Sequence, residues 1–177
     1  MAEGRFLRLE RVNYVDAKGQ TRTWESVQRQ KAQQAVFIVA RLIPSNRVVL
    51  IRQYRVPVEA FCLECPAGLI DEGENALDAA VRELREETGY LGKPVWNGGA
   101  TSSSAGMTGE LVTIVLMEVD ESLPENQHPA QHLDDGEDIE VHAVPLETLS
   151  AYIMERQTAG DVVDSRLSAW NAGCEWR

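Results

Sequence analysis

The chain has 177 residues, of which 44% are hydrophobic and 25% are charged, as expected for one globular domain with a substantial core. Its formal net charge of −11 argues against a nucleic-acid partner, because a nucleic-acid-binding surface normally carries a basic patch. No apolar run approaches the length that spans a bilayer, so no membrane partner is expected. An anionic substrate must then be held by a few local cations or by a metal ion.

Extended stretches dominate the predicted secondary structure. Alternating or β-branched patterns predict strands at residues 6–14, 21–29, 35–43, 48–54, 61–65, 93–100, 111–119 and 139–144. Helices are predicted between Asn75 and Gly89, and at residues 146–157 and 162–172, with loops at residues 101–109 and 121–138. This order is typical of an α+β domain in which a mixed β-sheet is sandwiched between α-helices.

A single domain is expected to cover residues 1–177, without repeats or linkers. The first two predicted strands are joined by a turn at residues 16–19 and predict an N-terminal β-hairpin extension within residues 1–32. Residues 33–177 are expected to form the core.

The three cysteines are Cys62, Cys65 and Cys174, an odd number in a chain whose first residues lack the apolar segment of a signal peptide. This favours a cytoplasmic location, where thiols stay reduced. A zinc site using the CxxC pair with His128 and His132 is the alternative. Buried cysteines acting as small hydrophobic side chains are the better interpretation, because strand residues three apart point to opposite faces.

The central predicted helix carries an unusual concentration of carboxylates. Asn75 is expected to cap its start, with Asp78 reaching back toward the free N–H groups, and Gly89 to end it. Glu83, Glu86 and Glu87 lie within one turn and repel one another. Such a cluster is either an ordinary solvated acidic face or a site for a hard cation such as Mg²⁺, which prefers oxygen ligands.

The spacing around this helix resembles the Nudix box. The matching residues are Gly68, Glu74, Arg82, Glu83, Leu84, Glu86, Glu87 and Gly89, followed by Tyr90 where an aliphatic residue is usual. The resemblance implies the Nudix fold and a Mg²⁺-dependent hydrolase, with Mn²⁺ as a possible substitute, that cleaves a diphosphate linked to another group. It implies that Glu83 and Glu87 bind the metal, helped by Glu86 and the carbonyl of Ala67. Arg82 is expected to pair with a carboxylate such as Glu74 and to act structurally.

Segments outside the box resemble the ADP-sugar, or ADP-ribose, pyrophosphatase branch of this family. They read TWESVQR at residues 23–29, RQYR at 52–55 and PAGLID at 66–71. The resemblance implies that Trp24 stacks on adenine, that Glu25 bonds the edge of the base and that Arg29 supports it. Phe6 stands where a second aromatic side chain closes the stack from the partner in a homodimer with exchanged N-terminal strands.

Arginines and two loops complete the expected site. Arg55 is expected to hold a phosphate, since its planar fork suits bidentate contact, although a salt-bridged sheet edge is the alternative for Arg52 and Arg55.

The loop with Ser104, Gly106 and Met107 resembles one that lines the sugar-phosphate pocket, with Ala105 replacing a proline. In the late acidic loop, Glu137 is the first candidate for a further catalytic carboxylate or metal ligand, and Asp135 is the second.

The resemblance therefore implies hydrolysis of a nucleoside diphosphate sugar, foremost ADP-ribose to AMP and ribose 5-phosphate. Phe6 and Ala105 keep open a broad or GDP/UDP-sugar hydrolase, and an enzyme that acts on oxidised nucleoside diphosphates is a further option. A catalytically silent ADP-ribose sensor is the alternative of another class. It is disfavoured because such sensors usually lose box carboxylates, which this chain retains.

Overall fold

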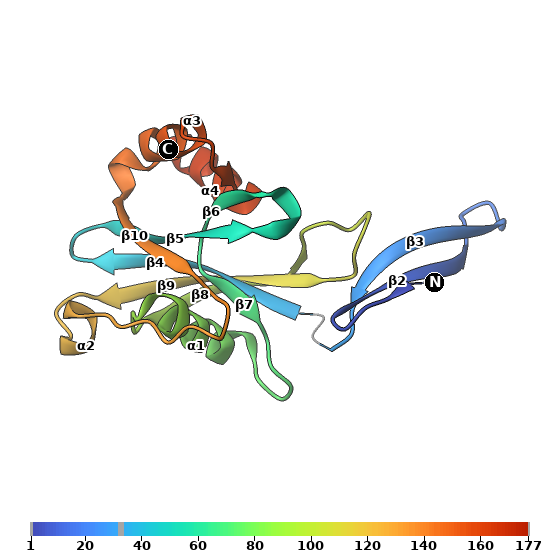
Figure 1. Ribbon diagram of the computed structural model, residues 1–177, viewed down its shortest axis with the longest axis horizontal. Helices are drawn as coiled ribbons and strands as arrows, with labels where there is room; N and C mark the ends of the chain where they lie inside the picture. The colour runs from blue at the N-terminus through green and yellow to red at the C-terminus, as the bar shows by residue number, and fades with distance from the viewer. Residues whose placement is uncertain (1, 32–33, 177) are drawn as a thin grey trace.

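The computed structural model describes residues 2–31 and 34–176, arranged as a layered core from which a hairpin projects (Figure 1). The hairpin sheet has the order β1–β2–β3, and its bounds are Ala2–Glu3, Leu7–Val15 and Thr21–Arg29. The predicted N-terminal hairpin is therefore present. Its expected boundary with the core, between residues 32 and 33, lies outside the described residues.

The core is built on a mixed sheet with the order β11–β6–β5–β4–β9–β8, to which β10 adds on β5 and β7 on β4. The strands are β4 (Gln34–Ile43), β5 (Arg47–Arg55), β6 (Ala60–Glu64), β7 (Ala67–Leu69), β8 (Lys93–Ser102), β9 (Leu111–Asp120), β10 (Ile139–Pro145) and β11 (Val162–Val163). The pairs β4–β9 and β6–β11 are parallel, and the other pairs are antiparallel. The α+β prediction is confirmed.

Helices cover both faces of this sheet (Figure 1). They are α1 (Ala76–Thr88), α2 (Pro124–Gln127), α3 (Leu149–Thr158) and α4 (Ser165–Glu175), with short 3-10 helices η1 (Val56–Val58) and η2 (Leu146–Thr148). Leu84 of α1 packs in one buried cluster with Val36 and Ile38 of β4. Phe37 of the same strand packs in the other cluster with Leu167 of α4. Alternate residues of β4 thus anchor the two helical layers.

Three segments differ from their predicted structure. Residues 67–69 form β7, residues 124–127 form a short helix inside the expected loop, and residues 162–163 are a strand and not the start of a helix. Helix α4 begins only at Ser165, because the side chain of Asp164 accepts hydrogen bonds from the backbone N–H groups of Arg166 and Leu167.

The caps of α1 agree with the sequence in all but one detail. The side chain of Asn75 accepts from the N–H groups of Leu77 and Asp78, and Gly89 ends the helix at a φ of 77°. The expectation for Asp78 was wrong. Its carboxylate accepts from Nδ2 of Asn75 at 2.6 Å, and so steadies the capping side chain.

The cysteines agree with the interpretation as hydrophobic side chains. All three are free, and Cys62 and Cys65 are buried. Burial raises the pKa of both buried thiols. Among the described residues, no helix combines the length and the apolar character needed to cross a membrane.

Candidate active site

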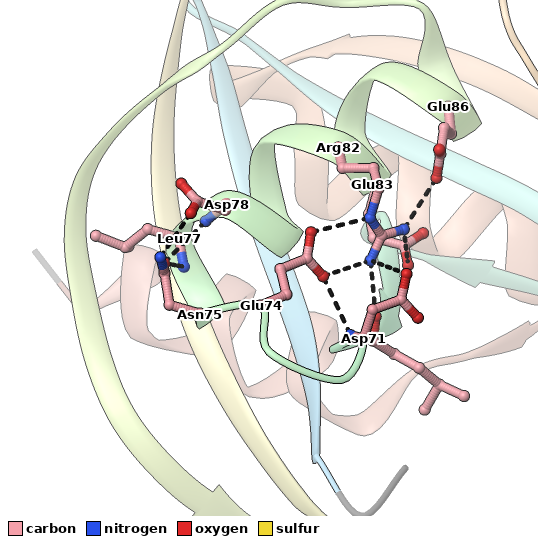
Figure 2. Close-up of polar contacts among 9 residues, drawn as sticks. Asp71, Glu74, Asn75, Leu77, Asp78, Arg82, Glu83 and Glu86 are labelled. Carbon is pink, nitrogen blue, oxygen red and sulfur yellow. Dashed lines mark hydrogen bonds and ion pairs between the residues drawn. The ribbon is translucent and has the colours of Figure 1, made fainter. Parts of the chain in front are cut away.

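Arg82 organises the turn that precedes α1 (Figure 2). Its guanidinium donates to both carboxylate oxygens of Glu74 at 3.0 and 2.8 Å and to the carbonyl of Leu69 at 2.9 Å. It also donates to Glu83 at 2.8 Å and to Glu86 at 3.0 Å. The hydrogen bond from Arg82 lowers the pKa of Glu74. The expected pairing of Arg82 with Glu74 is thus present, and it fixes the turn against the helix.

Gly68 leaves the space that the carboxylate of Glu83 occupies. A Cβ atom at Gly68 would lie 1.9 Å from Cδ of Glu83, which no pair of unbonded atoms tolerates. The absence of a side chain at Gly68 therefore lets a helix carboxylate contact the β7 backbone. In this chain, the first glycine of the Nudix box is therefore required for steric reasons.

Glu87 is buried beside the same strand. Its Oε2 accepts a hydrogen bond from the N–H of Ala67 at 3.0 Å. The pKa of Glu87 is raised to about 8, chiefly by burial and also by the nearby carboxylates of Glu83 and Glu137, although the hydrogen bond from Ala67 opposes the shift. Burial also raises the pKa of Glu83. Such carboxylates are costly to keep ionised unless a cation neutralises them.

These groups surround a cavity of about 430 Å³. Its lining residues are Ala67, Gly68, Leu69, Asp71, Arg82, Glu83, Glu86, Glu87, His132, Asp134 and Glu137. The fold thus brings the metal candidates together from β7, α1 and the late acidic loop. Asp135, a predicted candidate, is not among the lining residues. Asp134 and His132 are, and both were missed, because a loop sequence has no periodicity from which the facing side chains can be read.

The donor chemistry of this cavity fits a hard divalent cation. Most of the charged groups that line it are carboxylates, and the hydrogen bond that buried Glu87 accepts comes from the uncharged N–H of Ala67. In the arrangement described for residues 2–31 and 34–176, no three His, Cys, Asp or Glu side chains converge closely enough to hold a metal ion. Glu83 and Glu86 are turned toward Arg82, so metal binding requires them to rotate from it.

The two arginines of residues 52–55 lie on opposite faces of β5. Arg52 donates to Asp161 at 2.9 and 3.1 Å and to Glu140 at 2.9 Å, and its guanidinium lies 3.8 Å from the ring centroid of Phe61. Arg55 instead makes a bidentate ion pair with Glu64, at 2.8 and 2.6 Å. Both arginines thus form ion pairs, as the salt-bridge alternative predicted, and the phosphate contact of Arg55 stays a prediction.

The hairpin is tied to the loop between β8 and β9. Nε1 of Trp24 donates to the carbonyl of Gly106 at 3.1 Å, and the N–H of Val27 donates to the carbonyl of Met107 at 2.8 Å. Arg29 forms an ion pair with Glu110, the last residue of this loop. Four predicted substrate-binding residues are therefore brought together. The fifth, Ser104, closes the same loop, since its carbonyl accepts from the N–H of Met107 at 2.9 Å.

The side chains of two further hairpin candidates have other neighbours. Glu25 pairs with Arg11 at 3.3 Å, and it follows Trp24 in a strand, so the two side chains point to opposite faces. Phe6 is 67% exposed, and the guanidinium of Arg5 lies 5.0 Å from its ring centroid.

Comparison with known proteins agrees with this geometry. Residues 31–165 match the family model described as NUDIX domain. The chain is 39% identical to putative nudix hydrolase 2 of Caenorhabditis elegans, over 98% of this chain and 81% of that protein. It is 36% identical to the ADP-ribose pyrophosphatase of Saccharomyces cerevisiae (92% and 74%) and 34% identical to the ADP-sugar pyrophosphatase of Mus musculus (84% and 72%).

A solved structure extends the agreement to three dimensions. The crystal structure of an ADP compounds hydrolase has a TM-score of 0.67 and 26% sequence identity, and the match covers 87% of this chain and 78% of that one. The chain belongs to the Nudix family and is a Nudix hydrolase. Enzymes of this family generally use a divalent metal ion.

Proposed function

We propose that this Nudix hydrolase cleaves the diphosphate of a nucleoside diphosphate sugar, foremost ADP-ribose, to give AMP and ribose 5-phosphate. The observation that carries the proposal is the acidic cavity that gathers Glu83, Glu86, Glu87 and Glu137. Relatives from yeast and mouse that align with most of this chain are named for ADP-ribose and ADP-sugar pyrophosphatase activity.

The chemistry is substitution at phosphorus. The oxygen of water bonds to one phosphorus, the bridging P–O bond breaks, and the bridging oxygen leaves with the other phosphate. Mg²⁺, or Mn²⁺ in its place, would be held by Glu83, Glu87, Glu86, Glu137 and the carbonyl of Ala67. When bound, it neutralises charge on the diphosphate and favours ionisation of water.

The remaining groups of the chain position the reactants. Glu137, with Asp135 as the second candidate, orients the attacking water and accepts its proton. The N–H of Asp134 donates to the Glu137 carboxylate at 3.1 Å, which supports a fixed orientation. Arg55 holds a phosphate. Arg82 fixes the turn before α1 against the helix through its hydrogen bonds to Glu74.

The base would be bound at the hairpin, in a homodimer with exchanged N-terminal strands. Trp24 stacks on adenine, while Arg29 and Glu25 contact or support its edge. Phe6 is the second stacking ring. Its carbonyl accepts from the N–H of Gln30, six residues from Trp24 along the chain, so the backbones of Phe6 and Trp24 in one chain are roughly 20 Å apart at the strand rise of about 3.3 Å per residue. This separation supports a second ring supplied by the partner.

The exposure of the hairpin supports the same assembly. Leu7, Leu9, Val12 and Val15 of β2 are all exposed although they are apolar. A two-stranded hairpin with uncovered faces is at best marginally stable alone. A partner chain that covers these side chains removes that problem.

A cytoplasmic location is part of the proposal. It is supported by the three free cysteines, because cysteines of proteins in oxidising compartments are typically paired in disulfides.

A broad or GDP/UDP-sugar hydrolase is the second candidate. Phe6 favours it, because a phenyl ring offers less stacking area than an indole and has no N–H donor for the base.

Initial rates with ADP-ribose, a GDP-sugar and a UDP-sugar, each with and without Mg²⁺, separate the candidates. We expect kcat/KM to be at least about tenfold higher for ADP-ribose, the low end of the discrimination that pocket contacts supply, and turnover to stop after chelation. Equal rates for all three substrates would instead establish the second candidate.

A further inference from the structure

Glu64 is a buried carboxylate without an assigned role. It ends β6, is only 6% exposed, and both of its oxygens accept hydrogen bonds from the Arg55 guanidinium. A buried ion pair contributes little net stability compared with apolar side chains of similar size, because both charges lose their hydration. The pair therefore needs an explanation other than stability.

The strand register places this pair on the side of the acidic cavity. Ile51 of β5 lies opposite Glu64, so Glu64 and Arg55 share one face of the sheet. Arg55 is close enough to Glu87 for their charges to interact. Arg52 lies on the opposite face of the sheet, where it contacts Asp161.

Arg52 and Arg55 differ in how far their side chains are exposed to solvent, and this difference indicates different roles. The Arg52 side chain is 15% exposed, and its guanidinium is surrounded by two carboxylates and a ring, as in a structural ion pair. The Arg55 side chain is 44% exposed although its partner carboxylate is buried. Of five guanidinium N–H groups, the Glu64 contacts use one on Nε and one on Nη2, which leaves three for an anion.

We propose that Glu64 is a positioning residue, which holds the Arg55 guanidinium by its inner edge so that the outer N–H groups meet a phosphate of the substrate. This inference rests on the proposed hydrolysis of a nucleotide sugar. A guanidinium fixed in advance loses less conformational freedom when the phosphate binds. Glu64 therefore acts through Arg55 and does not contact substrate.

A double-mutant cycle tests this role. Arg55→Ala and Glu64→Ala are each expected to raise KM about tenfold, the low end for losing a hydrogen bond to a charged group, with kcat changed much less. In the Arg55→Ala background, Glu64→Ala should add less than about twofold, because it has no guanidinium left to position. Additive effects on KM, or an unchanged KM in Glu64→Ala, would overturn the proposal.

Two further variants keep the test decisive if Glu64→Ala does not fold. Glu64→Gln is nearly isosteric but lacks the charge, and it should raise KM, while Glu64→Asp should restore part of the loss. Asp161→Asn is the matched control, since it weakens the buried partner of Arg52 on the opposite face and should leave KM unchanged. Glu140→Gln, which removes the more exposed partner of Arg52, replaces it if needed.

The outcome is separable from that of the proposed function. If the wild type hydrolyses a GDP- or UDP-sugar in preference to ADP-ribose, the same cycle is run on that substrate, because it carries the same diphosphate. Wild-type turnover of any nucleotide sugar with an additive cycle would reject the role of Glu64 alone. Absence of turnover of all of them would reject the proposed function.

Discussion

The core and the hairpin differ in how their side chains are covered. In the core, both faces of the sheet are buried under helices, and the cavity carboxylates are held by contacts within one chain. On the hairpin, apolar side chains such as Leu9 and Val12 remain exposed, and Trp24 is 50% exposed. This contrast fits the proposal, in which one chain supplies all the metal-binding carboxylates and a partner chain completes the surface that recognises the base.

The largest expected effect lies in the core. Glu87→Gln should lower kcat by at least about a hundredfold, the lower end of what loss of a key electrostatic group costs, because a neutral amide cannot hold the metal. Steady-state rates at saturating Mg²⁺ measure it. Helix α1 should still form, since Asn75 and Gly89 keep its caps.

Glu155→Gln is the matched control, since it makes the same change on an exposed position of α3, in the opposite helical layer. It should leave kcat unchanged. Near-normal turnover of Glu87→Gln would show that Glu87 is not part of the metal site. The expected contrast between a large effect in the core and a smaller one at the hairpin would then fail.

A smaller effect is expected at the hairpin. Trp24→Ala should raise KM for ADP-ribose at least about fivefold, the low end for loss of a base–aromatic stack, and should change kcat less, because stacking contributes equally to substrate and transition state. Full saturation curves separate the two constants. A loss confined to kcat would contradict Trp24 as the adenine platform.

Mixing variants sharpens the hairpin test. If the two stacking rings come from different chains, co-expressed Trp24→Ala and Phe6→Ala chains form heterodimers in which one site has both rings and the other has neither. Such mixtures should contain sites with the wild-type KM, in contrast to either variant alone. Failure to recover any would place both rings in one chain.

The smallest effect concerns the stability of the core. Hydrogen bonds and charge from Arg166 lower the pKa of Asp164 although burial opposes this. A lowered folded-state pKa stabilises the protein above the unfolded value of about 3.9, and this contribution is lost as the pH falls through the folded value. Asp164→Asn keeps a cap and should cost about 0.5–1 kcal/mol at pH 7.

Urea unfolding midpoints of the wild type and of Asp164→Asn measure this contribution. The difference between them should shrink between pH 5 and pH 2. A difference that is the same at both ends of that range would show that the Asp164 charge is not responsible.

Local sequence was sufficient to predict most of the elements and the centre of the site. The Asn75 cap, the Gly89 end and the carboxylates four residues apart predicted α1 and its cavity-facing residues. Local signals failed where a partner strand decided the structure: residues 67–69 pair with β4, and residues 162–163 pair with β6. Short segments such as these carry too few residues for a periodic pattern.

The sequence by itself determined the α1 helix, its carboxylate spacing and its family, because helix geometry and the box depend on neighbours within about twenty residues. Only the tertiary structure decided that Arg55 pairs with the buried Glu64, that Arg52 pairs with Asp161 on the other sheet face, and that Asp134 joins the cavity lining. Those facts depend on the register of paired strands and on the path of a loop. Both are set by contacts between residues far apart in the chain.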